Sequence, residues 1–70
     1  IDPAEQELHR LIAAAPSRNK EFHASDLRRL IGQAAYDLRV LDVVRQFGCT
    51  KFAAILAVHG RAVLVGEIAR

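Results

Sequence analysis

The length of the chain, seventy residues, is the strongest constraint on its fold. A domain of this size buries only about 60% of the surface that its unfolded chain exposes. This excludes a large enclosed active site, a doubly wound nucleotide-binding fold and a barrel. Since 51% of the residues are hydrophobic and 26% are charged, we expect a folded chain. We expect one small helical domain over residues 1–70, cut from a longer protein because the first residue is isoleucine.

The first segment carries the clearest helix signal. Asp2 can accept hydrogen bonds from unpaired amides of a helix N-terminus, and Pro3 suits the first helical position. Apolar residues then recur three and four positions apart up to Ala15, which is the spacing of one helix face. Pro16 disfavours continuation of the helix. The pattern predicts a helix over 3–15.

A polar stretch and a second helix follow. Residues 17–24 are predicted to form a surface loop, in which Phe22 tucks back into the core. Ser25 is a favourable N-cap residue, and acidic and apolar residues after it predict a helix over 26–31.

Glycines divide the middle of the chain. Gly32 interrupts the apolar pattern and is expected to form a turn or a kink. Helical spacing resumes over 33–47, and Gly48 has the position of a helix C-terminal glycine.

The last third allows two interpretations. In the first, Thr50 caps a helix over 51–59 that ends at Gly60, and residues 61–69 form a fifth short helix. In the second, residues 52–58 and 62–68 are the strands of a β-hairpin, which the Val63-Leu64-Val65 run favours.

Two observations favour the helical interpretation. The segment 52–57 contains three alanines, which favour helix. An acid also precedes an arginine by three residues at Glu7, Asp26, Asp42 and Glu67, a spacing that stabilises helices.

The sequence therefore predicts an all-α fold, a small bundle of four to five short helices with a helix–turn–helix-like unit. The alternative is an α+β winged helix with a C-terminal β-hairpin and Arg61 at the tip of the wing. The expected core residues are Leu8, Leu11, Ile12, Leu27, Leu30, Ile31, Leu38, Leu41, Val44, Phe52, Ile55 and Leu56.

Catalytic and metal-binding patterns are weak. Cys49 is the single cysteine, so no internal disulfide can form, and we expect a cytoplasmic protein. The spacings of His9, His23 and His59 match no compact zinc pattern. The glycines form no phosphate-binding motif, and no apolar run reaches the roughly 18–20 residues that span a bilayer. We expect that the protein is not an enzyme. We also expect that it binds no cofactor, metal or small-molecule substrate and contacts no membrane.

Nucleic-acid binding is the leading functional hypothesis, and it rests on residues 22–47. Their apolar spacing around Gly32 is typical of a helix–turn–helix unit. Eight of the ten basic residues are arginines, which suit bidentate contacts with phosphate, although the net charge of +2 is small. Asp37 and Asp42 on the expected reading helix repel phosphate. The residues expected to contact DNA or RNA are Arg18, Lys20, Arg28, Arg29, Gln33, Tyr36 and Arg39.

Protein–protein interaction or dimerisation is the competing hypothesis. The segment 33–47 is apolar on two faces. One face has Ala34, Leu38 and Leu41, and the other has Tyr36, Val40, Val43 and Phe47. A core built from seventy residues cannot easily hide both faces, so an exposed remainder would bind a protein partner or a second copy. The residues expected on this interaction face are Val40, Val43 and Phe47.

Overall fold

The computed structural model describes residues 2–16 and 24–69, with the backbone alone for residues 24–26. These residues form four helices and no strand, in the order α1, α2, α3 and α4. The predicted all-α fold is therefore confirmed, and the alternative of a C-terminal β-hairpin is wrong. The predicted loop over 17–23 and the anchor Phe22 lie outside the described residues.

Helix α1 spans Pro3–Ala14 and begins as its sequence predicts. The Asp2 carboxylate accepts a hydrogen bond from the amide of Ala4 at 3.0 Å, which satisfies one of the free amides of the first turn. The predicted pair of Glu7 and Arg10 forms on the exposed side of the helix, with a nitrogen–oxygen distance of 2.7 Å.

Helices α2 and α3 span Ala24–Ile31 and Gln33–Phe47, and Gly32 alone separates them. Gly32 has a φ of +91°, a backbone conformation that glycine adopts without steric cost, and its amide donates to the Arg28 carbonyl. The predicted N-cap at Ser25 is wrong, because α2 begins at Ala24, two residues before the predicted start, and includes Ser25 in its first turn.

Helix α4 spans Lys51–Leu64, and the Thr50 hydroxyl accepts a hydrogen bond from the Ala53 amide as expected of its N-cap. The predicted end at Gly60 and the fifth helix over 61–69 are wrong, since α4 continues through Gly60 and a turn follows it. The reason lies in packing. A Cβ atom at Gly60 would overlap the carbonyl group of Leu11 in α1, so glycine permits the close approach of two backbones.

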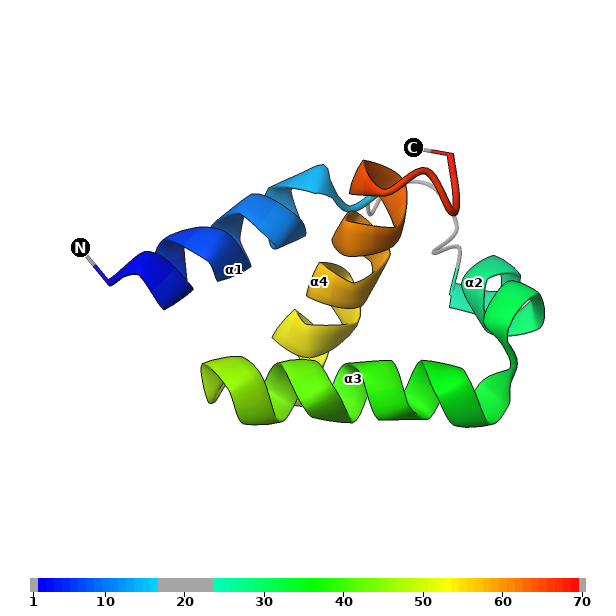
Figure 1. The fold of residues 1–70 in the computed structure, drawn as a ribbon, viewed down its shortest axis with the longest axis horizontal. Helices are drawn as coiled ribbons and strands as arrows, with labels where there is room; N and C mark the ends of the chain where they lie inside the picture. Colours follow the sequence, from blue (N-terminus) through cyan, green and yellow to red (C-terminus); the bar gives the residue numbers. More distant parts are fainter. Residues whose placement is uncertain (1, 17–23, 70) are drawn as a thin grey trace.

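Helix α4 is the centre of the fold (Figure 1). It crosses α3, with a bend of 112° between the two axes, while α1 packs along its other side and α2 lies at the N-terminal end of α3. No single helix among the described residues is long and apolar enough to cross a membrane, and α3 and α4 meet that length and composition only as a bent pair.

The core is assembled mainly on the small residues of α4, and several predicted core residues lie outside it. Leu30, Leu38, Leu41 and Phe52 are exposed by 61%, 60%, 41% and 59% of their surface, so their assignment to the core is wrong. Leu11, Leu27 and Leu56 are buried as expected. The buried apolar residues are Leu11, Leu27, Tyr36, Val40, Val43, Ala54, Leu56, Ala57, Val58 and Ala62.

Candidate interaction site on helix α3

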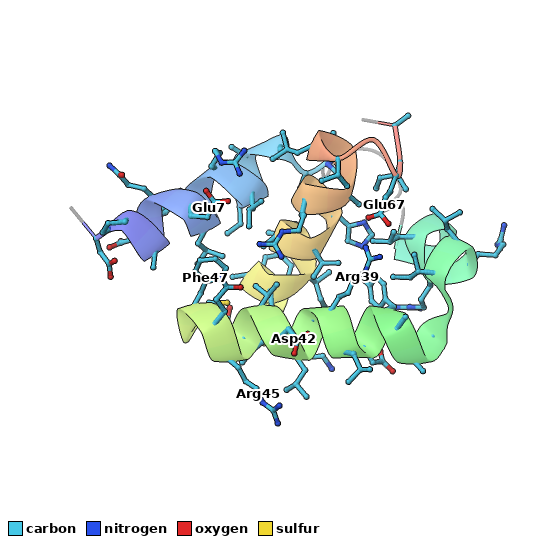
Figure 2. All side chains as sticks on the ribbon, in the orientation of Figure 1. Glu7, Arg39, Asp42, Arg45, Phe47 and Glu67 are labelled. Atoms are coloured by element: carbon cyan, nitrogen blue, oxygen red, sulfur yellow. The ribbon has the colours of Figure 1, made fainter. Side chains whose placement is uncertain are left out.

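Helix α3 turns one apolar face into the core. Tyr36, Val40 and Val43 are almost completely buried, and Phe47 is half-buried against the same cluster. Figure 2 shows Phe47 at the end of α3 on the side that faces α1. The prediction that Val40, Val43 and Phe47 form an exposed interaction face is therefore wrong, because Val40 and Val43 are buried in the core and Phe47 packs against it.

The opposite face of α3 is exposed and also apolar. Ala34, Leu38, Leu41 and Arg45 follow one another at intervals of four, three and four residues, which places them in one line along a helix. All four are exposed. Arg45, at the end of this line, points away from α1 and α4 (Figure 2). We name these four residues the outer stripe.

An acidic residue flanks the outer stripe on each side. Asp37 lies four residues before Leu41, and Asp42 lies four residues after Leu38, so each carboxylate stands one helical turn from a leucine. Both are exposed. Asp37 accepts a hydrogen bond from the Gln33 side-chain amide at 2.9 Å, and this neutral donor leaves the negative charge of Asp37 in place. Asp42 also lines a small hollow of 80 Å³ with Arg39 and Arg61.

Arg39, a predicted nucleic-acid contact, is paired with an acid. Its guanidinium donates two hydrogen bonds to the two carboxylate oxygens of Glu67, at 2.7 and 3.0 Å (Figure 2). These bonds lower the pKa of Glu67 below its ordinary value. The pair ties the turn after α4 to α3, so Arg39 is already engaged within the fold.

Tyr36, another predicted contact, is part of a buried polar cluster. Its hydroxyl group lies 2.9 Å from Nε2 of His59, a histidine with no exposed surface, and this contact joins α3 to α4. The guanidinium of Arg28 lies over the Tyr36 ring, 5.0 Å from its centre. Burial raises the pKa of the Tyr36 phenol, and Arg28 opposes this shift. Tyr36 therefore helps to hold α3 against α4.

Three of the predicted nucleic-acid contacts meet at one groove. Arg28, Gln33 and Tyr36 line a depression of 410 Å³ between α2, α3 and α4, together with Asp37, Val40, Lys51 and Ile55. Arg29 is exposed on α2. Arg18 and Lys20 lie outside the described residues.

The remaining reactive side chains of the described residues form no cluster with metal-binding geometry. No group of three or more histidine, cysteine or acidic side chains with metal-binding geometry occurs among the described residues. Cys49 is half-buried, with its Sγ atom 3.9 Å from the Val43 carbonyl oxygen, and packs as a small apolar residue.

Sequence reasoning missed Leu38 and Leu41 as surface residues, and the apolar spacing of α3 holds no signal that separates its two faces. The charged positions one turn from Leu38 and Leu41 are Asp37, Asp42 and Arg45. The face with Val40 and Val43 has as many polar positions one turn away, namely Asp37, Arg39 and Gln46.

Comparison with known proteins adds no relative, since no protein-family model, no curated protein and no solved structure matches the chain.

Proposed function

We propose that this chain is a non-enzymatic interaction module that binds an apolar helix of a partner protein through the outer stripe of α3. The observation that carries the proposal is the exposure of Leu38 and Leu41 by 60% and 41% of their surface, one turn apart on the same line of the helix. Leucines at this spacing are the anchors by which one helix holds another.

The energy available at the outer stripe fits a transient complex. Complete burial of a leucine contributes roughly 1.5–3 kcal/mol, and these two leucines are only partly exposed. The loss of translational and rotational freedom on association opposes this gain. The outer stripe is also smaller than the roughly 800 Å² per partner of a standard stable interface. We therefore expect weak binding that reverses readily.

A second copy of the chain fits the outer stripe less well than a foreign helix. Stacking Leu38 of one copy on Leu41 of the other brings the flanks of two α3 helices together. Both flanks of both copies then carry an aspartate, Asp37 on one side and Asp42 on the other. Like charges placed opposite each other disfavour the pair.

The test is titration with a synthetic amphipathic helix that has leucines at i, i+3, i+4 and i+7 and glutamines beside them. We expect chemical-shift changes at the outer stripe and at least a tenfold loss of affinity for Leu38→Asp, because an aspartate there cannot be buried against leucine. Leu30→Asp is the matched control, since Leu30 on α2 is exposed by 61% against 60% for Leu38.

Three results would contradict this function. The first is that the peptide does not bind, and the second is that Leu30→Asp weakens binding as much as Leu38→Asp does. The third is a dimer in sedimentation experiments that Leu38→Asp dissociates, because this would make a second copy the partner.

Nucleic-acid binding is the second candidate, and the groove is the observation that favours it. Arg28 from α2 and Lys51 from α4 both line this groove, so two cations from different helices could hold a phosphate group. The connection of α2 to α3 through Gly32 alone would then serve as the turn of a helix–turn–helix-like unit. Asp37 in the same groove opposes this function.

Measuring the affinity for a random DNA duplex at two salt concentrations tests nucleic-acid binding. If phosphate is bound in the groove, affinity falls steeply as salt rises, and Arg28→Ala weakens binding while Arg45→Ala, on the far side of α3, does not. Absence of binding at low salt, or equal effects of the two variants, would exclude the groove as a nucleic-acid site.

A further inference from the structure

The charges beside the outer stripe restrict which helix can bind it. Asp37 and Asp42 stand on opposite sides of the line through Leu38 and Leu41, so a helix lying along this line passes between two carboxylates. Both are exposed in the free protein and would lie at the rim of the interface. From this arrangement, and resting on the proposed function, we infer that the partner is a basic amphipathic helix with lysine or arginine on both sides of its apolar residues.

Cations also lie near both aspartates. Asp42 lines a hollow with Arg39 and Arg61, and Asp37 lines the groove with Arg28 and Lys51. Arg45 lies in line with the leucines at the C-terminal end of the stripe, one turn beyond Leu41. Arg39 is bound to Glu67 by two hydrogen bonds. The middle of the stripe is therefore flanked by two carboxylates, and a cation contributed by the partner can approach either of them.

The two carboxylates beside the outer stripe have the charge opposite to that of the whole chain. The net charge is +2, so the protein as a whole repels a basic peptide. A preference for a basic partner therefore has to come from the site itself. Charged pairs at the rim of an interface act mainly on the association rate and on the choice of partner, and they weaken as salt is added.

The arrangement also gives the partner a preferred placement. Its lysines or arginines have to come within reach of Asp37 and Asp42, which stand about a turn and a half apart along α3. Its cations also have to avoid the guanidinium of Arg45 at one end of the stripe. A helix with basic residues grouped around its central leucines meets both conditions.

Three synthetic helices with the same leucines test the inference, with lysine, glutamine or glutamate beside the apolar line. At low salt we expect the lysine peptide to bind about five to tenfold more tightly than the glutamine peptide, and the glutamate peptide to bind most weakly. The double variant Asp37→Asn/Asp42→Asn should remove this ranking, because asparagine keeps the shape of the side chain and removes its charge. Asp2→Asn, an exposed acid at the start of α1, is the control and should leave the ranking unchanged.

The possible results separate the inference from the function on which it rests. If the lysine and glutamine peptides bind the outer stripe equally, the basic partner is excluded and the interaction module stands. If the ranking persists in the double variant, charges elsewhere cause it and the inference is overturned. If no peptide binds, the interaction function itself falls.

Discussion

Replacement of Val43 by aspartate is expected to remove a large part of the stability of the domain. Val43 is exposed by only 3% of its surface and lies in the cluster that joins α3 to α4. A buried charge without a partner costs about 3–5 kcal/mol. A domain of seventy residues has a free energy of unfolding of about 4–10 kcal/mol in total. The variant should therefore melt at a much lower temperature than the parent protein, as measured by far-ultraviolet circular dichroism.

Leu41→Asp is the matched control on the same helix. Leu41 is exposed by 41% of its surface on the outer stripe, so its replacement should change the free energy of unfolding by less than about 1 kcal/mol. If Val43→Asp melted like the parent protein while Leu41→Asp unfolded, α3 would be rotated by half a turn from the orientation described above.

The orientation of α3 could not be predicted from the sequence. The sequence of residues 33–47 shows two apolar faces, but which of them turns inward depends on the helices that pack against it. The inward face carries Tyr36, whose hydroxyl group meets the buried His59 twenty-three residues later. Such a long-range contact leaves no mark on the local spacing of apolar residues, and periodicity alone does not rank two similar faces.

Sequence signals for helix ends predict the structure well where they depend only on neighbouring backbone groups. The caps at Asp2 and Thr50 and the glycine at Gly48 mark helix ends in the structure as the sequence predicts, because each acts on free amides or carbonyls within its own turn. Gly60 is also a glycine, but it lies inside α4 and does not mark a helix end. Its small size serves the contact with Leu11, forty-nine positions earlier in the chain, and sequence alone does not reveal that contact.

At the candidate site, too, the sequence indicates residue types, while long-range contacts decide how each side chain is used. Of the residues that the sequence predicts to contact phosphate, Arg28 and Gln33 line one groove, and their contact with phosphate stays a prediction. The tertiary structure engages the others differently, since Arg39 binds Glu67 across twenty-eight residues and Tyr36 enters the core. The surplus of apolar surface was also expected from the length of the chain, while its position at Leu38 and Leu41 required the fold.

Gly60→Ala is the second variant for which we expect a large effect. Whether it raises or lowers the free energy of unfolding distinguishes helix propensity from packing. In the interior of an isolated helix, alanine is more stable than glycine by about 1 kcal/mol. In α4, however, the added Cβ atom would overlap the carbonyl oxygen of Leu11, and a backbone group cannot rotate away as a side chain can. Helix α1 has to shift, so we expect a loss of about 1–3 kcal/mol in the free energy of unfolding, measured by urea denaturation.

Gly66→Ala separates this packing effect from ordinary strain at a glycine. Gly66 has a φ of +80° and open space around the position of a Cβ atom, so its replacement strains only the turn after α4. Hydrogen exchange should therefore increase along α1 in Gly60→Ala and remain unchanged there in Gly66→Ala. A rise in stability for Gly60→Ala, as helix propensity alone would give, would show that α1 and α4 are not in backbone contact. The fold built around α4 would then need a different arrangement of its first helix.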